Sequence, residues 1–239
     1  MEAWKEDLLN VLLAPGRQGE LFGKVTRIAR GWGFEHCAYG MRAPLPVAAP
    51  EIVMLNDYAP AWQKHYQANG YLQIDPLVQR GMTSLEMFAW SSIDATAGPA
   101  TGFWEEARAH GIATGVSIPA LAANSVRGML TLSRSHENMT EREFRGKRSA
   151  LVWLGQMAHH GLAQRLLLQW RSSAKRDLSE RETEVLRWVA EGKTNRQIAA
   201  KVGVTERTVY FHLNNAMGKL GVGNRTAAAV RAVVLGVIG

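Results

Sequence analysis

The sequence has little cysteine and no long apolar run, and each absence narrows what the chain can be. Cys37 is the only cysteine among 239 residues, which excludes a disulfide framework and a metal site built on cysteines. No stretch approaches the ~18 consecutive apolar residues of a membrane-spanning helix. The opening residues MEAWKEDLLN mix acids with apolar residues, unlike a signal peptide. We therefore expect a cytoplasmic protein without a membrane partner.

Patterns of catalytic or metal-binding residues are also scarce. His159 and His160 are adjacent, so on a helix they point about 100° apart, whereas helical metal ligands are spaced three or four residues apart. The run Gly115-Val116-Ser117 lacks the second glycine of a nucleophile elbow, and no glycine-rich phosphate loop follows a strand. The sequence predicts neither an enzyme nor a bound cofactor or metal.

Charge is plentiful but unevenly distributed. Residues 171–239 contain 12 Lys and Arg against 6 Asp and Glu, whereas residues 1–170 contain 16 against 15. The excess of positive charge therefore belongs to the last third of the chain. A basic domain joined to a nearly neutral domain fits binding to nucleic-acid phosphates. A basic surface that is merely solvated would have the same composition.

Apolar periodicity predicts an α+β fold for residues 1–168. It indicates helices at 2–13, 20–32, 60–68, after Asp75-Pro76, at 103–110 and at 140–168, and strands at 36–41, 52–55, 115–121 and 128–133. Helices before and after a set of short strands are typical of an α/β/α sandwich on an antiparallel sheet. Small polar and basic residues in the run QWRSSAKRD, 169–177, predict a linker at 169–176.

Residues 177–239 contain regular signals for the starts and ends of helices. Ser179 with Glu182, and Thr194 with Gln197, form two capping-box patterns. Four short helices with tight turns can bury their apolar faces only against one another, which predicts an all-α bundle. The second and third helices are joined across Gly203, so the bundle contains a helix-turn-helix.

The third helix of this bundle is the predicted DNA-reading helix. Val209 and Leu213 face inward, while Asn214 lies on the outward side and can pair bidentately with adenine. The other candidates suit phosphates, base edges or helix-end contacts to anions. The complete set of predicted DNA contacts is Lys193, Thr194, Thr205, Arg207, Thr208, Tyr210, Phe211, Asn214 and Arg225.

The run RETEVLRWVAEGKTNRQIAAKVGVTERTVYFHLNNAMGKLGVGNRTAAA resembles the LuxR-type helix-turn-helix. The positions that are most regular in that family are occupied here by Glu182, Leu186, Gly192, Thr208, Val209, His212, Lys219, Leu220 and Ala227. Tyr210 differs, since many relatives have Lys or Asn at that position. The resemblance implies binding to double-stranded DNA and does not specify the sequence that is bound.

A second group of residues lies between Tyr58 and Trp90. Tyr58, Trp62 and Tyr66 are four residues apart and share one helical face, and Asp75 follows in apolar surroundings. A carboxylate held there needs a hydrogen-bond donor. The residues alone leave two interpretations: Asp75 is a structural cap or ion-pair partner, or it accepts from the N–H of a bound ligand.

These residues resemble the sensor domain of the acyl-homoserine-lactone receptors in the LuxR quorum-sensing family. The family's six characteristic sensor positions are matched in type and spacing by Trp62, Tyr66, Asp75, Pro76, Trp90 and Gly115. The run GFEHCAYGMRAPLPVAAP is similar to the CepR and QscR branch. The resemblance implies an N-acyl homoserine lactone in a closed pocket of the first domain.

The resemblance also assigns roles to particular residues. Trp62 would donate to the lactone carbonyl, and Asp75 would accept from the amide N–H. Tyr58 and Thr131 would donate to the acyl carbonyl. The remaining candidates for lining the pocket are Tyr66, Val78, Trp90, Phe103, Trp104 and Ile118. A regulator of this kind is expected to bind an inverted repeat as a homodimer.

Two other kinds of control remain as alternatives. A phosphorylation-controlled regulator would use an acid such as Asp57, which follows the apolar run IVML. A receiver domain starts with a strand ending in paired acids, whereas this chain starts with two predicted helices, so this alternative is disfavoured. In the other alternative, the first domain only dimerises and DNA binding needs no ligand.

Overall fold

The computed structural model describes residues 3–13, 16–42, 52–92, 100–122 and 126–238, and within these the side chains of 169–177 are left aside. The described chain divides into two compact units. The first ends at Ala163 and the second begins at Gln164. No described helix is both long and apolar enough to cross a bilayer.

The first unit is built on a five-stranded antiparallel sheet with the strand order β2-β1-β5-β4-β3. The strands are β1 His36–Arg42, β2 Ile52–Asn56, β3 Phe88–Ser91, β4 Thr114–Leu121 and β5 Arg127–Arg134. The helices that precede or join them are α1 Ala3–Leu13, α2 Gln18–Gly31, α3 Pro60–Ala68, the short 3-10 helix η1 Tyr71–Gln73, α4 Pro76–Thr83 and α5 Thr101–Ala109.

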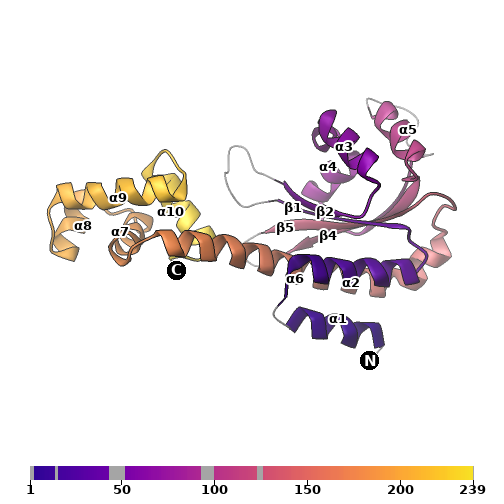
Figure 1. Ribbon diagram of the computed structural model, residues 1–239, viewed down its shortest axis with the longest axis horizontal. Helices are drawn as coiled ribbons and strands as arrows, with labels where there is room; N and C mark the ends of the chain where they lie inside the picture. The colour runs from indigo at the N-terminus through magenta and orange to yellow at the C-terminus, as the bar shows by residue number, and fades with distance from the viewer. Residues whose placement is uncertain (1–2, 14–15, 43–51, 93–99, 123–125, 239) are drawn as a thin grey trace. The chain divides into compact units, whose positions relative to one another are not determined.

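Helices cover both faces of this sheet. Figure 1 shows α2 and the start of α6 (Glu141–Asp177) along one face with α1 outside them, and α3, α4 and α5 over the other. The predicted α/β/α sandwich on an antiparallel sheet is confirmed.

The strand register decides which side chains face which layer. Ser117 is the cross-strand partner of Thr131, and Ile118 is the partner of Leu130. Because successive strand residues point to opposite faces, Thr131 and Ile118 belong to different faces. The face of Ile118 packs closely on α6, since a Cβ added at Gly155 would lie 2.4 Å from Ile118 Cγ2.

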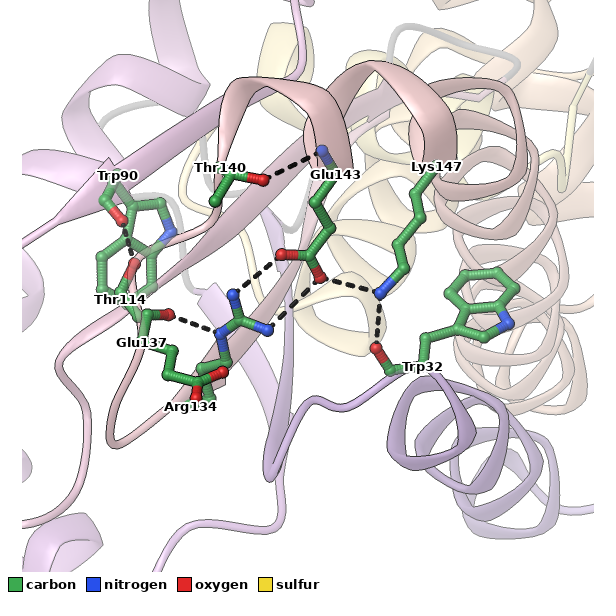
Figure 2. A network of polar contacts seen from close by, with 8 residues as sticks. All are labelled: Trp32, Trp90, Thr114, Arg134, Glu137, Thr140, Glu143 and Lys147. Carbon is green, nitrogen blue, oxygen red and sulfur yellow. Dashed lines mark hydrogen bonds and ion pairs between the residues drawn. The ribbon is translucent and has the colours of Figure 1, made fainter.

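A polar network fixes the start of α6 (Figure 2). The guanidinium of Arg134, at the end of β5, donates to both carboxylate oxygens of Glu143 at 3.3 and 3.0 Å. Lys147 donates to the same carboxylate at 2.8 Å and to the carbonyl oxygen of Trp32 at 2.7 Å. The backbone N–H of Glu143 donates to Thr140 Oγ1 at 3.1 Å. This network ties α6 to the sheet and to the end of α2.

The structure contains two elements that were not predicted, strand β3 (Phe88–Ser91) and the short helix η1 (Tyr71–Gln73). The segment predicted to be a linker, 169–176, is helical within α6. That segment contains neither glycine nor proline, so nothing in its composition stops a helix that begins at Glu141.

The second unit contains α7 Glu180–Ala190, α8 Asn195–Val202, α9 Glu206–Leu220 and α10 Arg225–Val234. Ser179 and Thr194 form the two predicted capping boxes, and Gly203 ends α8 at a φ of 69°, where a side chain would be strained. These helices bury one common core, with Leu186, Ile198, Val209, Ala216 and Ala228 fully covered. The predicted all-α helix-turn-helix bundle is confirmed.

Candidate functional site

A cavity of about 210 Å³ lies in the first unit, between the sheet and the layer formed by α3, α4 and α5. Most of the predicted ligand-site residues lie around it: Tyr58, Trp62, Tyr66, Asp75, Val78, Phe103, Trp104 and Thr131. The wall also contains residues that sequence reasoning missed, namely Ala38, Gly40, Arg42, Ile52, Met54, Asn56, Gln63, Gln67, Leu72, Leu77, Gly81, Met82, Ile112, Arg127, Gly128 and Met129.

Asp75 holds the polar end of this cavity. Its Oδ1 caps α4 by accepting from the backbone N–H groups of Leu77 at 2.8 Å and Val78 at 3.4 Å. Its Oδ2 accepts from the Tyr66 hydroxyl at 2.9 Å. Burial raises the pKa of the carboxyl, while these three donors lower it and only partly offset that effect. Asp75 is therefore a helix cap, and the same carboxylate lines the cavity.

The cavity is also lined by Tyr58, Trp62 and Thr131. Trp62 is 3% exposed, and its ring lies 5.8 Å from that of Tyr66 and 6.1 Å from that of Phe103, so packing fixes its orientation. Burial raises the pKa of the Tyr58 phenol, which keeps it protonated and able to donate. Thr131 Oγ1 is 3.0 Å from Ser117 Oγ.

A second polar cluster supports the wall from outside. Glu106 on α5 accepts from the Tyr71 hydroxyl at 2.6 Å and pairs with His65 on α3. The hydrogen bonds from Tyr71 and His65 hold the pKa of Glu106 below its ordinary range. His65 also stacks on Trp62, with ring centroids 6.1 Å apart. The cluster links α3 to α5 behind the indole that faces the cavity.

Two predicted lining residues lie elsewhere. Ile118 points to the opposite face of the sheet, against α6, because it alternates with Ser117 and Thr131 lies across from Ser117. Trp90 packs over Gly115, where an added Cβ would lie 2.7 Å from Trp90 Cζ2, and against Trp104 at 5.6 Å between ring centroids. Trp90 therefore lies behind the cavity wall, and Ile118 belongs to another part of the core.

Asp57, the candidate for phosphorylation, and His159, a candidate for metal binding, both have hydrogen-bond partners within the protein. Asp57 Oδ1 accepts from the Cys37 N–H at 2.7 Å, and its Oδ2 accepts from Arg30 at 2.9 Å. The ring nitrogens of His159 lie 2.9 Å from the Tyr39 hydroxyl and 3.0 Å from the Val126 carbonyl oxygen. No group of three or more His, Cys, Asp or Glu side chains in the described part of the chain is placed to hold a metal ion.

In the second unit, α9 presents the predicted base-reading residues on its outer side. Tyr210 is 58% exposed and Phe211 is 60% exposed, an unusual state for two adjacent aromatic side chains on a helix whose other face is buried. Arg207 is exposed and Asn214 is half-buried beside them. Thr205 caps the helix by accepting from the Thr208 N–H at 3.1 Å.

The other predicted DNA contacts lie at the turn before α8 and the start of α10. Arg225 donates to the Lys193 carbonyl oxygen at 2.6 Å and to Asn195 Oδ1 at 3.3 Å, so it joins these two turns. Thr194, the cap of α8, is exposed. Glu182, 3% exposed, accepts from Lys219 at 2.8 Å and thereby connects α7 to α9.

Both units match known families. Residues 17–162 match the family described as "Autoinducer binding domain", and residues 176–232 match "Bacterial regulatory proteins, luxR family". The transcriptional activator protein AnoR of Acinetobacter nosocomialis is 44% identical over 238 residues, which cover 100% of both chains.

Solved structures agree with these matches. The crystal structure of Escherichia coli SdiA has a TM-score of 0.76 and 29% identity, covering 99% of this chain and 98% of that one. The structure of CepR2 from Burkholderia cenocepacia, described as an N-acylhomoserine lactone dependent LuxR family transcription factor, has a TM-score of 0.63 and 27% identity over 68% of this chain and 95% of that one. The chain thus belongs to the LuxR family of autoinducer-binding, quorum-sensing transcriptional regulators.

Proposed function

We propose that the cavity of the first unit binds an N-acyl homoserine lactone and that this ligand controls DNA binding by the second unit. The observation that carries the proposal is the position of Asp75. This buried carboxylate lines a cavity and is surrounded by groups suited to one small amphiphile. The described dependence of CepR2 on an N-acylhomoserine lactone supports the same chemical class.

The proposed contacts use the hydrogen-bonding capacity of each side chain. Asp75 accepts from the ligand amide N–H, since a carboxylate has more acceptor positions than its cap and Tyr66 occupy. Trp62, whose indole is a donor only, donates to the lactone carbonyl. Tyr58 and Thr131 donate to the acyl carbonyl. The apolar walls, which include Val78, Phe103 and Trp104, cover the rest of the ligand.

DNA binding is proposed for the outer face of α9 and the turns beside it. Asn214, Tyr210 and Phe211 meet base edges in the major groove, and Arg207 meets phosphates. Lys193, Thr194, Thr205, Thr208 and Arg225 contact the backbone or hold the turns that do. A homodimer would place two such helices on the half-sites of an inverted repeat, and the chain would act in the cytoplasm.

The test is a titration of the full-length protein with a panel of N-acyl homoserine lactones. Thermal melting reports ligand binding, and fluorescence anisotropy of a selected DNA site reports DNA binding. We expect one or more lactones to raise the melting temperature and change DNA affinity in the wild type. Trp62→Phe should weaken both effects, while Trp32→Phe, outside the cavity, should leave them unchanged.

Other outcomes identify the alternatives. Identical melting and DNA affinity with and without every lactone would contradict ligand control and favour a constitutive DNA-binding protein. A response to acetyl phosphate in place of the lactones would favour phosphorylation.

A further inference from the structure

The cavity has a second polar end, formed by two arginines that the proposed contacts do not use. Arg42 ends β1 and Arg127 begins β5, and both line the cavity. Arg42 and Arg127 each lie one residue beyond Met41–Gly128, the last pair of the antiparallel β1–β5 register, and continuing that register by one residue places the two arginines opposite each other. Opposed residues on one face of a sheet have Cβ atoms about 5 Å apart.

Two like charges in this arrangement destabilise a sheet unless an anion lies near them. Among the described residues around the cavity, Asp75 is the only acid, and it belongs to the other end. Arg127 Nη1 is fully buried and has no hydrogen-bond partner in the described part of the chain. A guanidinium has only donors, so the partner that Arg127 Nη1 does not find among the described residues must be an oxygen or another electron-rich group.

The distance between the two polar ends is set by β5 and α4. Thr131 and Arg127 are four residues apart on β5, which corresponds to about 13 Å at ~3.3 Å per residue. Helix α4 runs alongside: Asp75 caps its start, and Gly81 near its end lies against Met129, two residues from Arg127. An extended carbon chain advances ~1.3 Å per bond of ~1.5 Å, so about ten bonds connect the ends.

From this geometry we propose that Arg42 and Arg127 form an anion-accepting subsite for the far end of the acyl chain. The preferred ligand class is then an N-acyl homoserine lactone whose chain carries a carboxylate about ten bonds from the acyl carbonyl. Two guanidiniums hold a carboxylate by charge-assisted hydrogen bonds, whereas a methyl end satisfies neither donor. This inference rests on the proposed function, because Asp75 and Trp62 must hold the lactone end.

The test compares synthetic N-acyl homoserine lactones of equal chain length that end in a methyl, a hydroxyl or a carboxylate group. Equilibrium dissociation constants are measured with the full-length wild type, with Arg42→Met and with Arg127→Met, which keep the length of the side-chain stem. Exposed Arg148 on α6 supplies the control, Arg148→Met. Thermal melting of each unliganded variant checks that it is folded.

We expect the wild type and Arg148→Met to bind the carboxylate-ended lactone at least about tenfold more tightly than the methyl-ended one. Arg42→Met and Arg127→Met should each reduce or abolish that preference while still binding the methyl-ended lactone. Equal or tighter wild-type binding of the methyl-ended compound overturns the subsite, as does an unchanged preference in both cavity variants. Failure of all three compounds to bind the wild type instead overturns the proposed function.

Discussion

Replacing Asp75 with asparagine separates the two roles that this residue has in the structure. Asparagine is as good a helix cap as aspartate, so the hydrogen bonds to the N–H groups of Leu77 and Val78 can be kept. The amide NH₂ that replaces Oδ2 is a donor, so the Tyr66 hydroxyl can turn and accept from it, whereas the proposed ligand N–H cannot donate to it.

The expected magnitude follows from these contacts. A hydrogen bond to a charged group contributes ~1.5–3 kcal/mol, which predicts a dissociation constant for the lactone roughly 10- to 150-fold higher in Asp75→Asn. The unliganded variant should melt no lower than the wild type. Burial raises the pKa of the Asp75 carboxyl above its ordinary value of 3.8. Ionisation of this buried group therefore lowers the free energy of unfolding as the pH rises, and asparagine, which does not ionise, removes that cost.

The assay is thermal melting with and without lactone, accompanied by a direct titration. Asp75→Ala is the contrasting variant, because it loses the helix cap, at a cost of about 1 kcal/mol, and leaves the Tyr66 hydroxyl without its acceptor. Asp75→Ala should therefore lower both stability and affinity, whereas Asp75→Asn lowers affinity alone. Wild-type lactone affinity in Asp75→Asn would refute the reasoning and leave Asp75 as a structural cap only.

Three further predictions concern packing, pH and DNA. Gly155→Ala should lower the free energy of unfolding in a denaturant titration. The added methyl group overpacks against Ile118 at a cost of ~1–3 kcal/mol, which cancels or exceeds the ~1 kcal/mol gained in helix propensity. A clearly stabilised variant would contradict this. Burial raises the pKa of Glu182, but Lys219 and the helix cap outweigh it and hold the pKa below the ordinary 4.5. The ionised Glu182 carboxylate thus contributes to the free energy of unfolding above pH 4.5, and this contribution should be lost as the pH falls below 4.5. The free energy of unfolding, measured over a pH series, should fall less steeply in Glu182→Gln. If Phe211 packs on a thymine methyl group, replacing thymine by uracil in a selected DNA site should weaken DNA binding by the wild type severalfold and leave DNA binding by Phe211→Ala unchanged. An equal loss of affinity in both proteins would refute that contact.

The second unit was the more predictable part of the chain, because its signals are local. Capping residues such as Ser179 and Thr194 and the terminating Gly203 act within a few positions of the helix ends that they define. Polar composition predicts a linker at 169–176, and this segment is helical within α6, since no residue there breaks a helix.

The cavity depends on strand register, which the sequence did not provide. Ile118 was expected at the ligand and lies on the other face, since it is offset by one residue from Ser117, the partner of Thr131. The same alternation, applied backwards along β5 from Thr131, leads to Met129 and Arg127, both of which line the cavity. The pattern of alternate residues was therefore available, but the sheet face could be assigned only once the pairing was known.

The central claim is that the first unit holds an N-acyl homoserine lactone through Asp75 and Trp62. Mass spectrometry of the small molecule that copurifies with the protein, when it is produced in cells that make such lactones, tests this claim most directly. We expect the wild type to carry about one lactone per chain, and Asp75→Asn and Trp62→Phe, purified in parallel, to carry far less. Wild-type protein without any lactone, or an equal amount in all three proteins, would contradict the claim.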